Sequence, residues 1–360
     1  MPGEVTQSQI TANLAKLGVR PDCHIMVHAS LSRFGQVFGG ASTVVAALRK
    51  AAGAGGALIV PSFRDAIRSD HFALRECEDS CPRSLCSSRE RGFTGIIGET
   101  VRGQPDALRS CHPTHSWVGV GAGAEFLLSG HGRSATPCGH DSPFFRLMQR
   151  DGIVLLLGVG AGSLTNLHAV EDARNVQYLS AIEPLRRHAT YTTSGRRIQY
   201  KYGDLLQDAC VTAGILRTRR IGAANCHLLR ARDLGSFLWV VTEDDPWCLV
   251  LRPARGAYDP EADAKAKTAR MVKVWNATRD FSAWERLLEA SRRPRQPVFF
   301  TPTDEPRMGC PAYRGRVRDH YRCAANDLPP WEKFSDYPPD EPGVATCDQC
   351  NWPPSTPCSK

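Results

Sequence analysis

Long hydrophobic runs are missing from this 360-residue sequence, and no segment approaches the roughly 18 apolar residues that a membrane-spanning helix requires. The start of the chain lacks a basic stretch followed by an apolar one, so no secretory signal is evident and a cytoplasmic location is expected. No helix-turn-helix, zinc-finger or RNA-binding signature accompanies the net charge of +8, which argues against a nucleic-acid partner. These absences favour a soluble globular protein, and the positive charge suits an anionic ligand.

Cysteine is abundant, with fourteen residues distributed unevenly along the chain. Disulfide frameworks belong mainly to small secreted domains, so we expect most of these residues to be reduced thiols. Two groups contain residue types that bind zinc: His71 with Cys77, Cys81 and Cys86, and Cys310 with Cys323, Cys347 and Cys350. The first spacing fits no standard site, and the second has one Cys-x-x-Cys pair with distant partners. Structural zinc is therefore an alternative that we do not favour, and no metal ligand is assigned.

Short, continuous apolar runs predict buried strands at residues 24–28, 57–61, 117–120 and 152–159. Helical spacing of apolar residues predicts helices at 8–18 and 42–52, and the second of these follows a glycine-rich turn. Alternation of such strands and helices is typical of an α/β protein. The sequence therefore predicts a layered α/β/α core with a mixed sheet.

The second half of the chain changes in composition. Residues 191–202 are rich in Thr and Arg and are compatible with a hairpin at one edge, helical spacing returns at 202–214, and further helix and strand signals reach Leu251. Beyond Arg252 helical signals persist over 262–288, and residues 291–360 are crowded with Pro, Arg and Cys. We therefore predict a main domain over 1–251 and a C-terminal extension over 252–360, helical in part and then irregular.

Three short blocks carry the candidate chemistry. They are His28-Ala29-Ser30-Leu31 leading to Phe38-Gly39-Gly40, the segment Arg109-Ser110-Cys111-His112-Pro113-Thr114-His115-Ser116, and the segment from Leu155 to Glu171. A glycine-rich turn that leads into a helix offers free N–H groups to an anion, although a plain strand-to-helix connection has the same residues. His168 precedes Glu171 by three residues, so both lie on one face of a helix that begins near Asn166. Such an imidazole can act as a base near neutral pH, or it can be a buried histidine bonded to a carbonyl.

In their order and spacing, these blocks resemble the aminoglycoside 3-N-acetyltransferase family, over roughly residues 8–251. The resemblance implies an acetyl-CoA-dependent N-acetyltransferase that modifies the 3-amino group of a 2-deoxystreptamine aminoglycoside and confers antibiotic resistance. It implies that His168 is the general base, assisted by Glu171 or by Asp204. It also assigns further residues along the cofactor. The CoA phosphates would be held by Ser30, Leu31, Ser32, Arg33, Gly35, Gly39 and Gly40, and hydrogen bonds to the thioester oxygen would come from His112, His115 and Ser116.

Other functions remain open on the sequence alone. Cys111 beside His112 would allow a thiol nucleophile, but adjacent residues in an extended segment point to opposite sides. The net charge of +8 is unusual for an enzyme that binds polycations, so the same fold acting on a different amine in secondary metabolism is one alternative. A non-catalytic, zinc-stabilised binding protein is another. The sequence does not predict an oligomeric state.

Overall fold

A mixed sheet forms the centre of the protein. The computed structural model describes residues 4–63, 85–86, 91–112, 115–131, 138–174, 202–251, 257 and 259–290, and the backbone of 313–317 and 320–323. Seven strands pair in the order β3-β4-β2-β1-β5-β7-β6. Their bounds are β1 (His24–Ala29), β2 (Ala57–Pro61), β3 (Leu108–Arg109), β4 (Trp117–Val120), β5 (Ile153–Leu157), β6 (Leu216–Ile221) and β7 (Ala224–Arg230). β1 is parallel to β2 and to β5, whereas the remaining pairs are antiparallel, so the predicted mixed sheet is confirmed.

The predicted strands coincide with β1, β2, β4 and β5, because these strands are covered by helices on both sides. All five residues of β5 are buried, as are all four of β4, so each strand is apolar throughout and does not alternate. The outer strand β6 differs. Its two ends are buried, but the stretch between them contains Arg217, Arg219 and Arg220. Charged side chains of this kind hinder pairing of an edge strand with another chain.

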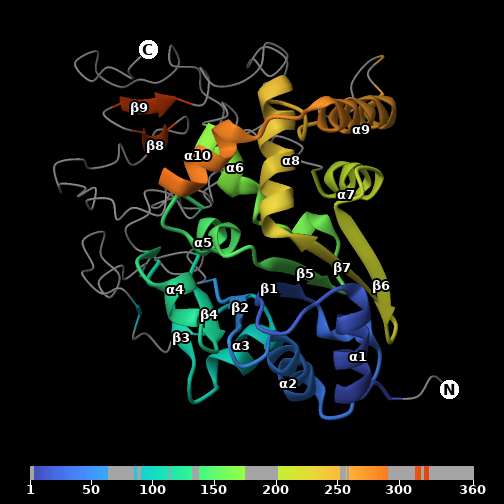
Figure 1. The fold of residues 1–360 in the computed structure, drawn as a ribbon, viewed down its shortest axis with the longest axis vertical. Helices are drawn as coiled ribbons and strands as arrows, with labels where there is room; N and C mark the ends of the chain where they lie inside the picture. Colours follow the sequence, from blue (N-terminus) through green and yellow to red (C-terminus); the bar gives the residue numbers. More distant parts are fainter. Residues whose placement is uncertain are drawn as a thin grey trace, which may run out of the picture.

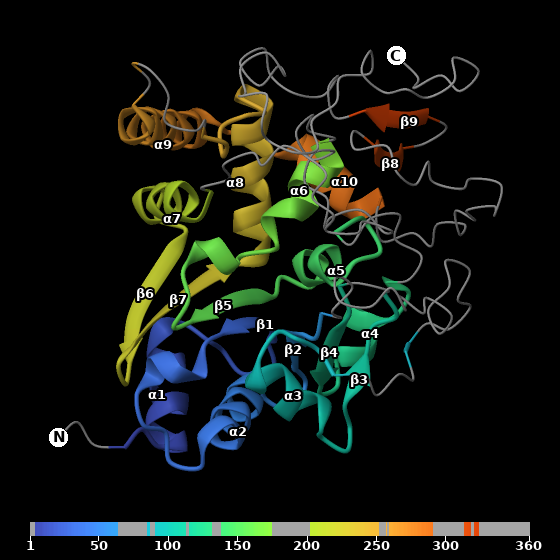
Figure 2. The same ribbon diagram turned by 180° about the vertical axis from the view of Figure 1, so that it is seen from behind.

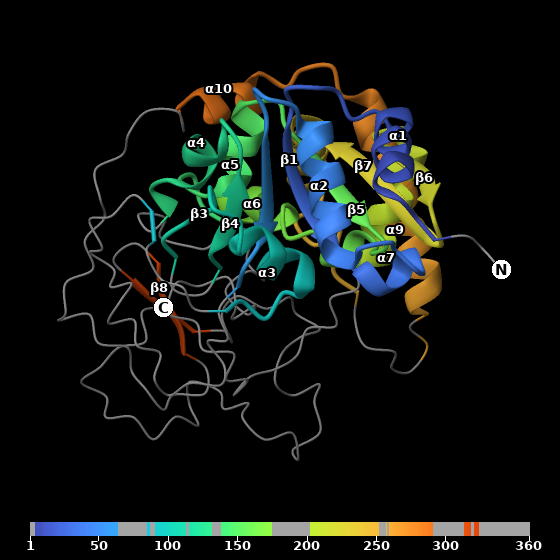
Figure 3. The same cartoon turned by 90° about the horizontal axis from the view of Figure 1, so that it is seen from below.

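Three helices cover one face of the sheet: α1 (Gln7–Leu17), α2 (Gly40–Ala52) and α3 (Ile96–Arg102). In Figure 1 α1 and α2 lie below β1, β2 and β5, and in Figure 3 they lie in front of these strands. α1 begins with a capping box, in which the Thr6 side chain accepts from the N–H of Gln9 and the Gln9 side chain accepts from the N–H of Thr6. Apolar residues of α1 and α2, including Ile10 and Leu48, pack on the strand residue Val27.

The other face is covered by a larger group of helices, which lie on the opposite side of the sheet from α1 and α2 in Figure 2. They are α4 (Ala124–Leu128), α5 (Pro143–Gln149), α6 (Leu167–Arg174), α7 (Tyr202–Thr212), α8 (Ala231–Asp244), α9 (Pro260–Ala277) and α10 (Ser282–Ala290). The helical stretch predicted over 262–288 is therefore two helices, α9 and α10. Trp284 of α10 is fully buried and packs on Gly235 of α8. The helices that follow Leu251 thus share a hydrophobic core with α5 and α8.

An antiparallel hairpin forms one edge of the sheet, and it is built by β6 and β7 with Gly222 in its turn. The hairpin expected earlier in the chain, at 191–202, lies outside the described residues except for Tyr202, which begins α7. In the extension, β8 (Tyr313–Val317) pairs with β9 (His320–Cys323). The rest of 291–360 lies outside the described residues.

Among the described residues, no helix has the length and hydrophobicity to cross a membrane, and no group of His, Cys, Asp or Glu could hold a metal ion. Most of the cysteines considered as zinc ligands lie outside these residues. The described cysteines whose side chains are placed, Cys23, Cys86, Cys111, Cys138, Cys210, Cys226 and Cys248, form no disulfide.

Candidate active site

The topology of the sheet places a switch point at its carboxyl edge. β1 and β5 are adjacent and parallel, so both end at this edge. The chain leaves β1 toward α2 on one face, whereas it leaves β5 toward α6 on the opposite face. Neighbouring parallel strands whose connections diverge in this way form a switch point, and ligands of open α/β sheets bind outside it. Two of the three predicted site segments, the turn after β1 and the segment after β5, start at this switch point.

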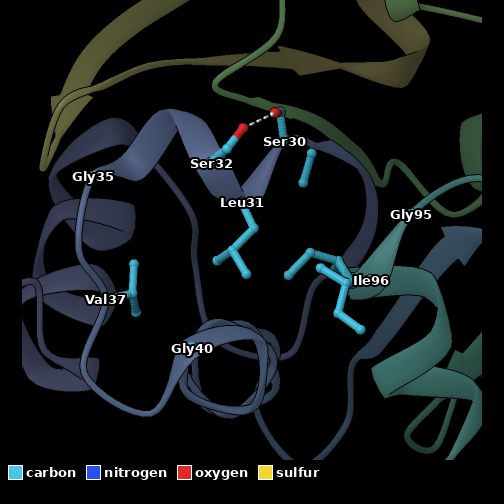
Figure 4. Close-up of a pocket in the computed structure, with 10 residues that line it drawn as sticks. Ser30, Leu31, Ser32, Gly35, Val37, Gly40, Gly95 and Ile96 are labelled. Carbon is cyan, nitrogen blue, oxygen red and sulfur yellow. Dashed lines mark hydrogen bonds between the residues drawn. The ribbon is translucent and has the colours of Figure 1, made fainter.

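A pocket of about 530 Å³ lies on the α2 side of the switch point. It is lined by Ala29, Ser30, Leu31, Ser32, Gly35, Val37, Gly40, Gly95, Ile96 and Ile97. Figure 4 shows the turn between β1 and α2 on one side of this pocket and the start of α3 on the other. Five of the seven residues predicted to hold the CoA phosphates therefore share one pocket. Arg33 and Gly39 are not among the lining residues: Arg33 packs against Gly158, and Gly39 precedes α2 with a φ of 72°.

The pocket lining combines apolar side chains with three glycines and two serine hydroxyls. Gly40 has a φ of 61° and Gly95 a φ of 98°, and a Cβ built on either would meet no atom within 4 Å. Both glycines therefore combine a left-handed backbone with open space beside them. The hydroxyls of Ser30 and Ser32 are hydrogen-bonded at 3.2 Å, and Gly40 is the first residue of the 13-residue helix α2. A helix N-terminus and nearby hydroxyls can bind an anion here.

A buried histidine–carboxylate pair lies on the α6 side. His168 Nδ1 is 2.6 Å from Glu171 Oε2, and the two side chains are 9% and 0% exposed. The helical spacing predicted from the sequence is confirmed, because α6 covers both residues. A carboxylate oxygen accepts a hydrogen bond, so Nδ1 donates and the basic lone pair of His168 is at Nε2. In this tautomer, Nε2 is the atom that can take a proton from a substrate.

The third residue predicted for proton transfer, Asp204, lies in the first turn of α7, where only the backbone is described. Its side chain is therefore outside the described part of the molecule. α7 itself lies beside the segment that follows β5, because Gln207 Oε1 accepts from the N–H of Ala161 at 3.1 Å. The helix is thus at the same end of the sheet as α6.

His112 and His115 lie in the segment between β3 and β4. Both are buried, and the N–H of His115 donates to Nδ1 of His112 at 3.0 Å. Nδ1 of His112 is therefore an acceptor, which places its ring proton on Nε2. Burial, together with the charge of His168, lowers the pKa of His115 to about 3. His115 is consequently neutral near pH 7, and its ring lies 4.7 Å from that of Phe63.

Ser116 was predicted to donate to a thioester oxygen, and its contacts differ from that prediction. Its hydroxyl donates to the carbonyl oxygen of Ser62 at 2.7 Å and accepts from Arg109 Nε at 3.0 Å. The single hydroxyl proton is therefore engaged at the end of β2. Arg109 also donates to the Ser62 carbonyl, at 3.0 Å, and is 4% exposed. Ser116 and Arg109 therefore connect the segment between β3 and β4 to the residue that follows β2. The sequence alone assigned no role to Arg109.

His28 and Asn166 also lie at the switch point, and neither had a role in the sequence-based site. His28 is 6% exposed near the end of β1, and burial lowers its pKa to about 4 despite a side-chain interaction with Asn166. Asn166 precedes α6 and donates from Nδ2 to Met26 Sδ at 3.2 Å. His28 lies within the first motif block, but its neighbour is 138 positions away in the sequence. Only the fold could bring the two side chains together.

The profile of one protein family, described as aminoglycoside 3-N-acetyltransferase, matches residues 26–241. This segment contains β5, α6, the pocket and most of β1, so it includes the whole described site. The chain belongs to the aminoglycoside 3-N-acetyltransferase family. The resemblance found in the three motif blocks is confirmed.

Individual members of the aminoglycoside 3-N-acetyltransferase family support the same assignment. Aminoglycoside N(3)-acetyltransferase VIII of Streptomyces fradiae is 32% identical over 275 residues, which cover 65% of this chain and 91% of that protein. The crystal structure of aminoglycoside acetyltransferase AAC(3)-IIb is 32% identical, with a TM-score of 0.52 and coverage of 68% of this chain and 98% of that chain. A binary complex of AAC-IIIb with CoASH is 25% identical, with a TM-score of 0.51 and coverage of 67% and 97%.

Proposed function

We propose that this protein transfers the acetyl group of acetyl-CoA to the 3-amino group of a 2-deoxystreptamine aminoglycoside and thereby confers antibiotic resistance. The observation that carries the proposal is the buried His168–Glu171 pair at the switch point of a chain of this family. The relatives named above are called aminoglycoside acetyltransferases, and one of them was solved with CoASH. An acidic partner on Nδ1 and a lone pair on Nε2 suit the removal of a proton from an amine.

The acyl donor fits the pocket on the α2 side. Hydroxyls of Ser30 and Ser32 and the N-terminus of α2 offer donors to the phosphates, while Leu31 and Ile96 offer apolar surface to the pantetheine chain. The glycine at position 40 leaves room for close approach of a ligand to the backbone. Ala29, the last residue of β1, lines the pocket, so we place the bound thioester at the end of the pocket nearest the switch point. His168 lies on the other side of that point.

In the proposed reaction the acceptor enters as the neutral amine, and His168 Nε2 removes one proton from its nitrogen as that nitrogen attacks. The nitrogen forms a bond to the thioester carbonyl carbon, the carbon–sulfur bond breaks, and the CoA thiolate leaves. His168 then returns the proton to the sulfur, so no enzyme-bound acetyl group forms. Glu171 holds the ring through Nδ1 and stabilises the imidazolium, and Asp204 is the other carboxylate proposed to assist. Cys111 is 2% exposed and has no part in this route.

Negative charge develops on the thioester oxygen as the amine attacks. His112 carries its ring proton on Nε2, and His115 is neutral near pH 7, so both can act as hydrogen-bond donors without being protonated. We assign the stabilisation of the oxyanion to these two side chains. Ser116 supports the segment that carries them, through the end of β2. Its role in this proposal is therefore structural.

The reaction is tested by mass spectrometry of purified protein incubated with acetyl-CoA and a panel of amines that includes 2-deoxystreptamine aminoglycosides. Product mass avoids thiol-reactive dyes, which the fourteen cysteines would confound. The expected result is one added acetyl group, which NMR of the product places on the 3-amino nitrogen. A protein that binds acetyl-CoA but modifies no aminoglycoside would contradict the proposed substrate.

A different amine is the second candidate substrate, and the net charge of +8 favours it, because polycations are repelled by a basic protein. The fold, the acyl donor and the proton transfer would be unchanged. The same panel distinguishes the two candidates when it also contains monoamines and amino sugars. Acetylation of those compounds with kcat/KM above that of every aminoglycoside would establish the second candidate.

We propose that residues 1–251 supply all reacting groups and that 252–360 form an extension. The helices α9 and α10 of this extension pack on α7, α8 and α5, and Met271, Trp284 and Leu288 are buried in that contact. The helices α9 and α10 therefore support the fold of the catalytic part. Truncation after Leu251 is expected to lower the thermal midpoint, because it removes these buried side chains.

A further inference from the structure

Two strand residues contact the segment that begins α6. Met26 Sδ accepts from Asn166 Nδ2 at 3.2 Å, and the His28 imidazole interacts with the same asparagine. Met26 and His28 are two positions apart in β1, so both side chains lie on the face of the sheet that α6 covers. The ring of His28 also lies edge-on to Trp117, with centroids 5.6 Å apart and planes at 89°. His28 is thus held between β4 and the start of α6.

His28 and Asn166 each have one buried polar atom whose hydrogen bonding is incomplete among the described residues. Among the described residues, neither His28 Nε2 nor Asn166 Oδ1 has a hydrogen-bond partner of good geometry, although both atoms are shielded from solvent. A buried polar group without a partner is costly, so sites of this kind commonly have a function. The proposed reaction uses neither group. The Asn166 amide is oriented by its other contact, with Met26, and by its interaction with His28.

Asn166 also shapes the first turn of the helix that carries the proposed base. Its carbonyl oxygen accepts from the N–H of Ala169 at 3.2 Å, and the N–H of His168 donates to the carbonyl oxygen of Thr165 at 3.1 Å. The backbone of Asn166 is therefore part of the turn from which the His168 side chain projects. A shift of Asn166 relative to β1 would move this turn, and with it the His168 ring.

We propose that His28 is a positioning residue for acetyl transfer, which acts through Asn166 to fix the first turn of α6 and hence the direction of the His168 imidazole. This inference rests on the proposed function, because His168 is the base in that reaction. We assign the proton on His28 Nε2 as a donor toward Asn166 Oδ1, because these are the two buried atoms without a partner of good geometry among the described residues, while Met26 Sδ accepts from the amide nitrogen. His28 contacts no reacting atom.

Replacement of His28 by glutamine or by asparagine tests whether one nitrogen of its ring is required or whether the side chain only fills space. The amide nitrogen of glutamine can occupy the place of the imidazole Nε2, whereas asparagine reaches only the place of Nδ1. His28→Gln is therefore expected to retain kcat within about threefold, and His28→Asn to lower it roughly 10- to 100-fold, with KM for acetyl-CoA unchanged within about twofold. Equal loss in both variants, or no loss in either, would contradict the proposal.

His227 provides a matched control. It is 7% exposed, and it lies opposite Leu156, the residue of β5 that pairs with His28 on its other side. Its Nδ1 is bonded to Thr218 Oγ1 at 2.8 Å, so it has a different partner. His227→Asn should leave kcat and its pH profile unchanged. A loss equal to that of His28→Asn would show that any buried histidine of this row acts by packing alone.

A double-mutant cycle tests whether the effect passes through Asn166. Asn166→Leu alone and His28→Asn alone should each lower kcat, and the double variant should be no slower than the slower single variant. If the loss of kcat in the double variant equals the product of the two single losses, His28 acts by a route that does not include Asn166.

The NMR titration of the His168 ring supplies a readout that needs no turnover. His28→Asn should shift that titration, and His227→Asn should not. If no amine of the panel is acetylated but the titration is still shifted in His28→Asn, the proposed function is rejected and the positioning role is kept. An unshifted titration would reject that role.

Discussion

The two sides of the switch point differ in the kind of group they present. On the α2 side, none of the ten residues that line the pocket has a titratable side chain, because the lining consists of five apolar residues, three glycines and two serines. On the α6 side, the buried groups are titratable, and they include His28, His115, His168 and Glu171. The backbone and hydroxyls on one side suit a fixed anion, whereas the desolvated imidazoles on the other suit proton transfer. A substitution on the α2 side can therefore change the binding of acetyl-CoA without changing the deprotonation of the amine, and a substitution on the α6 side can do the reverse.

Removal of the proposed base, His168, should cause the largest loss of activity. It should affect proton transfer on the α6 side and leave acetyl-CoA binding on the α2 side unchanged. His168→Ala removes the only proposed proton acceptor, so kcat should fall by roughly 10²- to 10⁴-fold. Product mass gives the rate, and calorimetry gives the affinity for acetyl-CoA, which should remain within about twofold because the pocket is on the other side. Full activity of this variant would remove His168 from the mechanism.

Glu171→Gln should have a smaller effect of the same kind. Glutamine has the shape of glutamate but no charge, so it cannot stabilise the imidazolium that forms on His168, and kcat should fall by about 100-fold. KM for acetyl-CoA should change little. A kcat equal to that of the wild type would mean that Glu171 does not act on His168.

Stability at acidic pH should depend on the buried histidines of the α6 side. Burial lowers the pKa of His115 to about 3 in the folded protein, below its unfolded value of about 6.5. The unfolded state therefore binds more protons between these values, and stability present above pH 6.5 is lost as the pH falls toward 3. His115→Gln should reduce this slope by about 1.4 kcal/mol per pH unit near pH 5. Urea denaturation at several pH values measures it, and an unchanged slope would mean that His115 is protonated in the folded state.

The mildest change is a substitution on the α2 side. Gly40→Ala places a methyl group in the open space of the pocket at a φ of 61°, so KM for acetyl-CoA should rise about fivefold while kcat is unchanged. Gly214→Ala is the control, because Gly214 also has a positive φ of 74° and open space beside it but does not line the pocket. Equal changes in the two variants would show that backbone strain, and not the pocket, causes the effect.

The sequence was most informative where local pattern determines structure. The apolar runs located β1, β2, β4 and β5, and the spacing of His168 and Glu171 placed them on one helical face, because both signals depend on residues close together in the chain. The hairpin of β6 and β7 was missed, since the arginines of β6 interrupt its apolar pattern. No local pattern could show that the Ser116 hydroxyl bonds a carbonyl 54 residues earlier. The contact of His28 with Asn166 was out of reach for the same reason.

A crystal structure of the protein with CoA and an aminoglycoside would show whether the α2 side binds the acyl donor and the α6 side deprotonates the acceptor. We expect the pyrophosphate to lie against Ser32 and the N-terminus of α2, with the thiol directed to the α6 side and the reacting amine within hydrogen-bond distance of His168 Nε2. CoA phosphates outside this pocket, or an amine whose nearest basic group is not His168, would contradict this division.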